Sequence, residues 1–462
     1  MIHFKRLGFS GPAAWLRRAV LLVLIAAGVS PALRADGSLL AQPVEPRIQR
    51  LTAAAERPSG NLHRAYGPVL SADGQLVVFW SSAADLVTND TNGAVDVFVA
   101  DRHTGVIERV STASDGSQAN GPSLNAALSP DGRYVAFESR ATNLAARDTN
   151  ATSDIFLKDR ASGALERISL STAGGQGNGP SYRPAISADG RFVAFWSEAG
   201  NLVPDDDNGS YDNGGYDIFV KDRLTGVLER ASVAQDGTEA VADSVAPSLS
   251  ADGRFVAFGS YASNLVDRDN NGMPDIFVKD RHTGAVERVS VAADGTESNG
   301  DSFWNAAISP DGRFVAFWSE ASNLVPGDTN GLVDAFVKDR QTGAIERVSV
   351  SADGAQANGP SYNPLLSADG RFVVFWSEAI NLVPGDSNGA ADVFIKDRQT
   401  GSIERLSVAD NGGQGNGPSY NPTISADSRF IAFWSAANNL TPDDANERVD
   451  VFVVDRTAAL AR

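Results

Sequence analysis

Three observations predict an all-β fold, a seven-bladed β-propeller built from four-stranded antiparallel blades. One unit recurs seven times along the 462 residues, and no window shows a convincing helical hydrophobic period. The last copy lacks its fourth strand, whereas a matching strand precedes the first copy. The aspartate of a recurring turn marks the repeat at intervals of 58 to 63 residues, at Asp73, Asp131, Asp189, Asp252, Asp311, Asp369 and Asp427.

Each copy is expected to fold into four short strands, A to D, and the fifth copy shows why. Its strands are predicted at residues 305–308, 313–319, 334–338 and 344–350. A Ser-Pro-Asp-Gly turn joins A to B, because proline presets φ and Asp-Gly tolerates positive φ. A long loop rich in Asp, Asn and Gly joins B to C, and a hairpin turn joins C to D. Strand B is apolar on both faces, so it should be buried between neighbouring blades.

Large aromatic side chains at the centre of strand B are predicted to be core residues. The phenylalanines are Phe79, Phe137, Phe195, Phe258, Phe317, Phe375 and Phe433, and the tryptophans are Trp80, Trp196, Trp318, Trp376 and Trp434. One aromatic per blade at a fixed strand position favours packing over a carbohydrate-binding platform.

The two ends of the repeat region predict a closed ring. Residues 48–52 resemble residues 345–349, a strand D, but no strand A, B or C precedes them. The seventh copy reaches its strand C at 450–454 and has no strand D of its own. The N-terminal strand should therefore complete the seventh blade, which leaves no sheet edge exposed.

The repeat resembles a known family, the TolB-type propeller repeat. The resemblance rests on Ser-(Pro/Ala)-Asp-Gly-Arg-Phe-Val-Ala-Phe followed by Asp-Ile-Phe-Val-Lys-Asp, and it covers residues 47–456. It implies the propeller fold and an extracytoplasmic setting. We expect neither the extra N-terminal domain of TolB nor the hydrolase domain of propeller peptidases, so the resemblance implies no particular partner or reaction.

The N-terminal segment predicts export. Basic residues precede an apolar run at 19–29, which small residues follow, and this order is typical of a secretory signal. The run is short for a membrane span, although a retained anchor is the alternative. We therefore expect a signal peptide at 1–35, a linker at 36–46 and a single propeller at 47–462. The location should be periplasmic or extracellular, without stable membrane insertion after cleavage.

Composition excludes several functions. A formal charge of −18 disfavours binding to nucleic acid or anionic membranes. The absence of cysteine excludes disulfides, thiolate metal sites and a cysteine nucleophile. The four histidines are isolated, so no Ser/His/Asp set can be assembled, and no pair of carboxylates stands out as acid and base. We expect a monomer whose partner is a protein or a cell-envelope component.

The D–A and B–C loops should lie on one face, around the mouth of the central channel. Several D–A segments read Asn-Gly-Pro-Ser-Tyr-(Asn/Arg)-Pro, and convergent aromatic and amide groups in a concavity favour binding. The third B–C loop is five residues longer than the others and contains two tyrosines. The candidate ligand-binding residues are Tyr182, Arg183, Trp304, Asn305, Tyr362, Asn363, Tyr420 and Asn421, with Tyr211 and Tyr216 from this longer loop. The alternative is that the prolines and tyrosines only seat the loops between blades.

The B–C loops also carry a recurring Asp-x-Asn-x-x-x-Asp pattern. The fourth loop matches the first half of a calcium loop but lacks the closing glutamate. The candidate Ca²⁺ ligands are Asp267, Asp269, Asn271 and Asp275, with Asp205 and Asp207 in the third loop. The alternative is that these side chains accept bonds from backbone N–H groups and hold the loop without metal.

These observations favour an exported, non-catalytic binding or scaffold propeller. It would recognise a protein or cell-envelope ligand on the face of the B–C and D–A loops, with Ca²⁺ as a candidate aid. The rival hypothesis is a carbohydrate-active propeller enzyme, a lyase or a glycosidase that uses loop carboxylates. A third hypothesis is a purely architectural envelope protein.

Overall fold

The computed structural model describes residues 47–52, 64–204, 206, 215–444, 446 and 448–457, without the side chains of Phe303 and Trp304. The predicted signal peptide and linker lie outside the described residues. Residues 47–462 form one compact unit. Among the described residues, no helix is long and apolar enough to cross a membrane.

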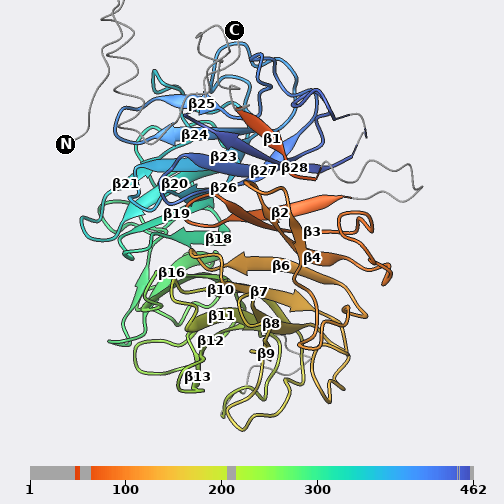
Figure 1. Ribbon diagram of the computed structural model, residues 1–462. Helices are drawn as coiled ribbons and strands as arrows, with labels where there is room; N and C mark the ends of the chain where they lie inside the picture. Colours follow the sequence, from red (N-terminus) through yellow and green to blue (C-terminus); the bar gives the residue numbers. More distant parts are fainter. Residues whose placement is uncertain are drawn as a thin grey trace, which may run out of the picture. The chain divides into compact units, whose positions relative to one another are not determined.

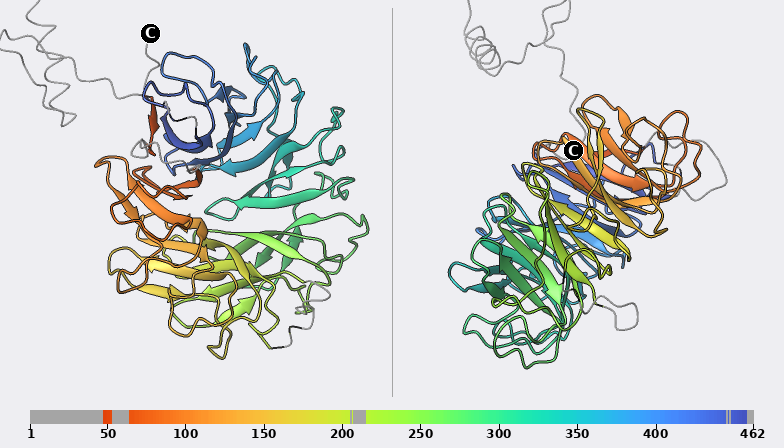
Figure 2. Two further views of the ribbon diagram at one scale, coloured as in Figure 1. Left: turned by 90° about the vertical axis from the view of Figure 1, so that its right-hand side faces the viewer. Right: turned by 90° about the horizontal axis from the view of Figure 1, so that it is seen from below.

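The described residues form seven four-stranded antiparallel sheets, which follow one another in sequence order (Figures 1 and 2). Blade 1 consists of β2 (Ala65–Leu70), β3 (Leu76–Ser81), β4 (Asp96–Asp101) and β5 (Ile107–Arg109); blade 2 of β6 (Ser123–Leu128), β7 (Tyr134–Ser139), β8 (Asp154–Asp159) and β9 (Leu165–Arg167); blade 3 of β10 (Ser181–Ile186), β11 (Phe192–Ser197), β12 (Asp217–Asp222) and β13 (Leu228–Arg230); blade 4 of β14 (Ser244–Leu249), β15 (Phe255–Ser260), β16 (Asp275–Asp280) and β17 (Val286–Arg288). Blade 5 consists of β18 (Ser302–Ile308), β19 (Phe314–Ser319), β20 (Asp334–Asp339) and β21 (Ile345–Arg347); blade 6 of β22 (Ser361–Leu366), β23 (Phe372–Ser377), β24 (Asp392–Asp397) and β25 (Ile403–Arg405); blade 7 of β26 (Ser419–Ile424), β27 (Phe430–Ser435), β28 (Asp450–Asp455) and β1 (Ile48–Arg50).

Ring closure is confirmed by the pairing of β1 with β28. The two strands are antiparallel, with Ile48 opposite Val454 and Arg50 opposite Phe452. The N-terminal strand therefore supplies strand D of blade 7, and the first and last parts of the propeller share one sheet (Figure 1).

The core lies between the blades, where strands B and C present phenylalanines to each other. Phe317 on β19 stands opposite Phe336 on β20, with ring centroids 5.9 Å apart. All seven predicted strand B phenylalanines have 0% exposure, which confirms that prediction. The tryptophans differ. Trp196 is buried, and Trp80, Trp376 and Trp434 are half-buried but pack against the buried core clusters, which confirms the predicted packing role of these four. Trp318 is half-buried as well. The tryptophans stand one residue further along strand B, close to the B–C loop.

The face of the A–B and C–D turns locks adjacent blades together. Phe255 begins strand B of blade 4, and the guanidinium groups of Arg254 and Arg340 lie 4.7 Å and 4.6 Å from its ring centroid. Gly312, in the A–B turn of blade 5, lies so close to the same ring that it has no room for a Cβ atom. This face is therefore occupied by structural contacts between blades.

Candidate functional site

Each blade places one residue of special backbone conformation near the start of strand A. The register of strand A against strand B shifts at this point, as in a β-bulge. The residue there has a positive φ, between 41° and 66°, a region that asparagine and glycine adopt more readily than other residues. These seven bulge residues are Gly67, Asn125, Arg183, Ala246, Asn305, Asn363 and Asn421.

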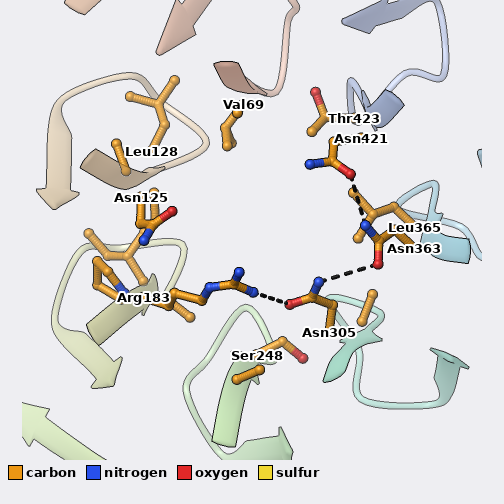
Figure 3. A pocket seen from close by; sticks show the side chains of 18 of the residues that line it. Val69, Asn125, Leu128, Arg183, Ser248, Asn305, Asn363, Leu365, Asn421 and Thr423 are labelled. Carbon is orange, nitrogen blue, oxygen red and sulfur yellow. Dashed lines mark hydrogen bonds between the residues drawn. The ribbon is translucent and has the colours of Figure 1, made fainter. Parts of the chain in front are cut away.

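The seven bulge residues line one cavity at the centre of the ring, with a volume of about 510 Å³ (Figure 3). Apolar side chains such as Val69 and Leu365 line it as well, together with the indole of Trp80. No aspartate or glutamate is among the described residues that line it. The cavity is therefore a concave site with a polar rim, of the kind that binds ligands.

Four of the bulge residues form a hydrogen-bonded arc, called here the amide arc (Figure 3). Arg183 Nη1 donates to Asn305 Oδ1 at 3.0 Å, and Asn305 Nδ2 donates to Asn363 Oδ1 at 3.3 Å. Asn363 Nδ2 then donates to Asn421 Oδ1 at 2.8 Å. The sequence predicted all four residues as ligand contacts, and the structure brings them together.

The amide arc bridges one gap in the ring and leaves another open. Ala246 of blade 4 has no polar side chain, and the long side chain of Arg183 reaches past it from blade 3 to blade 5. Gly67 of blade 1 has no side chain, and no residue bridges it among those described. A Cβ atom at Gly67 would lie 2.7 Å from Trp80 Nε1, so the indole N–H fills part of that place.

Glu138 is a buried carboxylate behind the rim, and the sequence analysis missed it. It is 6% exposed and accepts bonds from Asn125 Nδ2 at 2.9 Å and from the backbone N–H of Arg183 at 3.3 Å. Burial raises its pKa, and the hydrogen bond from Asn125 lowers it in part. A comparison of the seven copies could have revealed it, because Glu138 stands where most blades carry tryptophan in strand B.

The predicted tyrosines pack between blades near the rim. Tyr362 stacks on Trp376 of its own blade at 4.5 Å and meets Trp318 of the preceding blade edge-on at 5.3 Å. Tyr420 repeats this arrangement with Trp434 and Trp376. The alternative that the tyrosines seat the loops between blades therefore has direct support, and their role in ligand binding stays a prediction.

Tyr182 also packs on the tryptophan of its own blade, and it adds a hydrogen bond at its hydroxyl. Tyr182 packs on Trp196 and Tyr216, and its hydroxyl donates to Glu198 Oε1 at 3.1 Å. Burial raises the pKa of Tyr182 further than the nearby carboxylate does, so the hydroxyl stays protonated. Tyr211 lies outside the described residues.

Trp304 does not hold the tyrosine position that the repeat spacing suggested. Phe303 pairs with Trp318 as Tyr362 pairs with Trp376, so Phe303 is the equivalent residue. Trp304 is the extra residue of the seven-residue strand β18 and falls within its register shift. A one-residue insertion inside a bulge moves every residue before it by one place relative to the other copies.

The loop carboxylates surround an arginine from strand D. In blade 4, Asp269 Oδ1 lies 2.9 Å and Asp275 Oδ2 3.3 Å from Arg288 Nη1. Asn271 Nδ2 donates to Asp275 Oδ2 at 2.9 Å, and its Oδ1 accepts from the backbone N–H of Met273. Asp267 is exposed. The guanidinium of Arg288 thus lies where the calcium-loop prediction would place Ca²⁺. Asn271 accepts a hydrogen bond from a backbone N–H, as the alternative without metal predicted.

The same arrangement recurs in every blade and is called here the clamp. In each clamp, two aspartates of the loop surround one arginine of strand D. The groups are Arg109 with Asp90 and Asp96, Arg167 with Asp148 and Asp154, Arg230 with Asp206 and Asp217, Arg288 with Asp269 and Asp275, Arg347 with Asp328 and Asp334, Arg405 with Asp386 and Asp392, and Arg50 with Asp444 and Asp450. Its sequence signal was the arginine of each Ile-Glu-Arg-like strand D, which the sequence analysis left unpaired.

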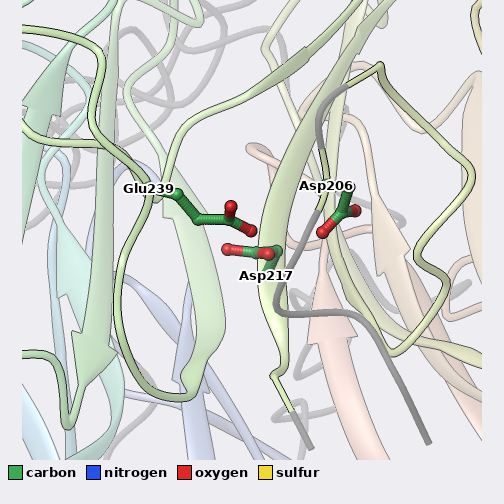
Figure 4. Close-up of side chains that lie close together, drawn as sticks. All are labelled: Asp206, Asp217 and Glu239. Carbon is green, nitrogen blue, oxygen red and sulfur yellow. The ribbon is translucent and has the colours of Figure 1, made fainter.

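Blade 3 gathers three carboxylates around its clamp (Figure 4). Oxygen atoms of Asp206, Asp217 and Glu239 all lie within 4.8 Å of one another, a geometry that could hold a metal ion. Arg230 Nη1 lies 3.1 Å from Asp206 and 3.5 Å from Asp217 and also contacts Glu239. Burial, and then repulsion from Asp217, raise the pKa of Asp206 to about 7. The predicted ligands Asp205 and Asp207 lie outside the described residues.

This cluster should make stability depend on pH. The native pKa of Asp206 exceeds the value of about 3.9 for an unfolded chain, so the native state binds more protons between those values. The unfolding free energy of the wild type should therefore rise as the pH falls from 8 to 5, by up to about 1.4 kcal/mol per pH unit. Asp206→Asn should raise the melting temperature at pH 8 and flatten this slope, measured calorimetrically in EDTA.

The control for that measurement is Asp353→Asn, at an exposed aspartate whose pKa a hydrogen bond from Ser351 lowers. It should leave the slope between pH 8 and pH 5 unchanged. If the unfolding free energy of Asp206→Asn changes with pH as steeply as that of the wild type, Asp206 is not a buried carboxylate that becomes charged in this range.

No family model and no curated protein sequence matches the chain. Among solved structures, it is similar to an oligogalacturonate lyase in complex with manganese, with a TM-score of 0.53 and 13% identity over 92% of this chain and 95% of that chain. It is similar to an oligogalacturonate lyase from Vibrio parahaemolyticus, with a TM-score of 0.53 and 15% identity over 93% and 97% of the two chains. The β-propeller domain of the Trilobed protease from Pyrococcus furiosus gives a TM-score of 0.52 and 12% identity over 86% and 96%.

These likenesses show the propeller fold alone. TolB from Acinetobacter baumannii aligns with a TM-score of 0.38 and 18% identity, over 74% of this chain and 65% of that chain. The seven-bladed propeller is thus confirmed, while the TolB type of its repeat stays a prediction from the sequence motifs.

Proposed function

We propose that the chain is an exported, non-catalytic binding propeller that recognises a protein or cell-envelope ligand at the mouth of its central channel. The observation that carries the proposal is the amide arc from Arg183 to Asn421 on the rim of a cavity of about 510 Å³. These side chains are half-buried or exposed and contribute little to the core. Polar groups that converge on a concavity from separate blades serve recognition better than folding.

Export and metal binding enter this proposal in different ways. The basic and apolar N-terminal segment supports export. Recognition at the mouth does not require Ca²⁺, because Arg230 already supplies a positive charge to the carboxylates of blade 3. A metal contribution from that cluster is tested by the EDTA arm of the experiment below.

Binding can be tested by retention of envelope components on immobilised protein. Asn363→Ala removes the middle of the amide arc and should reduce retention of the recognised component at least fivefold, measured by quantitative mass spectrometry. The matched control is Gln399→Ala, an exposed amide in the C–D turn of the same blade, which should retain as much as the wild type. The comparison is made with and without EDTA. If no component distinguishes Asn363→Ala from both the wild type and Gln399→Ala, the mouth is not the binding site.

A carbohydrate-active enzyme is the second candidate, and Glu138 is the observation that favours it. Burial raises the pKa of this carboxyl behind the rim, as a general acid requires. Lyase and glycosidase chemistry needs a second group, and no carboxylate is among the described residues that line the cavity. We therefore expect no turnover of oligogalacturonate. Turnover that Glu138→Gln abolishes would favour the enzyme.

A further inference from the structure

We infer that the channel mouth binds the carboxylate of an acidic glycan, at the opening that Gly67 leaves in the ring of bulge residues. This inference rests on the proposed function and names the ligand chemistry of the same site. It depends on the direction of the hydrogen bonds in the amide arc and on the donors that border the opening.

Arg183 fixes the direction of every hydrogen bond in the amide arc. A guanidinium can only donate, so Asn305 must turn its Oδ1 toward Arg183 and its Nδ2 toward Asn363. Asn363 must then accept through Oδ1 and donate through Nδ2 to Asn421. The last amide, Asn421, has its Oδ1 engaged and ends the arc with an NH₂ group. The arc therefore begins with a cation and ends with donors.

The opening over blade 1 is bordered by N–H donors of Asn421 and Trp80 and, on its other side, by the Oδ1 of Asn125 (Figure 3). Asn421 Nδ2 and Trp80 Nε1 have no hydrogen-bond partner among the described residues, and Trp80 and Asn421 both line the cavity. On the other side of the opening, Asn125 directs its Nδ2 away, toward Glu138. Figure 3 shows the Asn421 amide nitrogen turned toward the cavity beside Val69.

The lining of the cavity carries one positive charge, although the protein as a whole is acidic. Arg183 is exposed in the cavity, and it is the one charged residue among the described residues that line it. Glu138, the nearby acid, accepts from the backbone N–H of Arg183 and from Asn125 and is 6% exposed. A carboxylate has only acceptors, and its bonds to charged or N–H donors are strong, so it fits this set of groups.

The surroundings of the opening suit a sugar. Amides offer a donor and an acceptor each and so match hydroxyl groups, which do the same. Trp80, at the opening, is the end of a continuous aromatic belt with successive ring centroids 4.5 to 5.3 Å apart. The aromatic belt consists of Trp318, Tyr362, Trp376, Tyr420, Trp434, Tyr66 and Trp80. The part of the Trp80 indole that lines the cavity gives a pyranose ring an apolar surface to lie against.

The charge requirement can be tested with two ligands that share a sugar backbone and differ in whether their carboxyl groups are ionised or esterified. Trigalacturonate and its fully methyl-esterified form are titrated calorimetrically into the wild type, which should bind the acid at least tenfold more tightly. Arg183→Gln should weaken binding of the acid at least tenfold and shrink the difference in affinity between the acid and the ester. Equal affinity of the wild type for acid and ester, or binding of neither, would overturn the inference.

The position of the carboxylate can be tested with two variants at the opening. Asn421→Asp keeps the oxygen that accepts from Asn363 but replaces the donor with a negative oxygen, so binding of the acid should fall at least tenfold. Gly67→Asn should fill the opening with the same loss, and blade 6 already accommodates Asn363 beside Trp376. Gly105→Asn is the control, because Gly105 has a similar φ of 71° in open space in a C–D turn. Unchanged affinity in both Asn421→Asp and Gly67→Asn would overturn the assignment of the opening, and thermal melts confirm that the variants fold.

The glycan and the proposed function can fail separately. A tripeptide with a free C-terminal carboxylate is compared with its amide, and tighter binding of that peptide than of trigalacturonate would overturn the choice of a glycan. If the retention of envelope components depends on Asn363 but not on Arg183 or Asn421, the mouth binds a ligand and the inference of a carboxylate is wrong. If retention depends on none of the three, the proposed function fails as well.

Discussion

Arg50→Met is expected to lower the unfolding free energy by about 3–5 kcal/mol, because it leaves buried carboxylates without their cation. The Arg50 side chain is 1% exposed, and its Nη1 lies 3.0 Å from Asp444 Oδ1 and 3.8 Å from Asp450 Oδ2. Arg50 belongs to β1, whereas Asp444 lies in the B–C loop before β28 and Asp450 begins β28, so this clamp also fastens the two ends of the ring. Urea unfolding of the purified protein at pH 8 measures the loss.

Two comparisons separate the clamp from a general weakening of β1. Gln49→Met changes the neighbouring half-buried residue of the same strand and should cost less than about 1 kcal/mol. Burial, and then repulsion from Asp450, raise the pKa of Asp444 to about 6, so the cost of Arg50→Met should shrink below pH 6, where this carboxyl is neutral. Equal losses for Arg50→Met and Gln49→Met would contradict the closing role of the clamp.

Gly312→Ala is expected to destabilise the propeller by about 2–5 kcal/mol, because the new methyl group would overlap the half-buried ring of Phe255 and the backbone is in a left-handed conformation. Gly312 has a φ of 74°, and an added Cβ would lie less than 3.0 Å from the ring of Phe255 in the preceding blade. The guanidinium groups of Arg254 and Arg340 both pack against that ring, so it cannot move away without breaking these contacts. Thermal and urea unfolding measure the effect.

Gly327→Ala is the matched control for Gly312→Ala. Gly327 has a φ of 75° and no heavy atom within 4 Å of an added Cβ, so only the backbone term of about 1–2 kcal/mol remains. If the two variants are destabilised equally, the contact between the A–B turn and the neighbouring blade contributes nothing to stability.

The fold was predictable because its determinants lie within one repeat. The alternation of apolar and polar residues, the turn residues and a strand B that is apolar on both faces define each blade from its own sequence. This pattern occurs in seven copies. Closure was predictable as well, since residues 48–52 read as a strand D without a blade. The degree of burial of the tryptophans was not predictable, because the periodicity of a strand does not say how far a residue lies from the end of its blade. Trp318 and its equivalents stand near the B–C loop and remain half-buried.

The site was predictable in part, and the missing part consists of contacts between blades. The sequence singled out Arg183 and three asparagines, because they recur in the D–A segments. It could not show that Arg183 reaches past Ala246 to the blade after next, since that bond joins residues 122 positions apart. The strand D arginines that neutralise the loop aspartates also belong to a different strand from their partners. Glu138 was visible as a departure from the repeat, and its burial made it a candidate.

Hydrogen–deuterium exchange in the presence of a retained envelope component tests the central claim, that ligands bind at the channel mouth. Binding should slow exchange at the bulges of strand A, within 181–186, 302–308, 361–366 and 419–424. Exchange in the A–B and C–D turns of the same blades should not change. Protection that is confined to those turns would contradict the claim, because it would place the ligand on the opposite face.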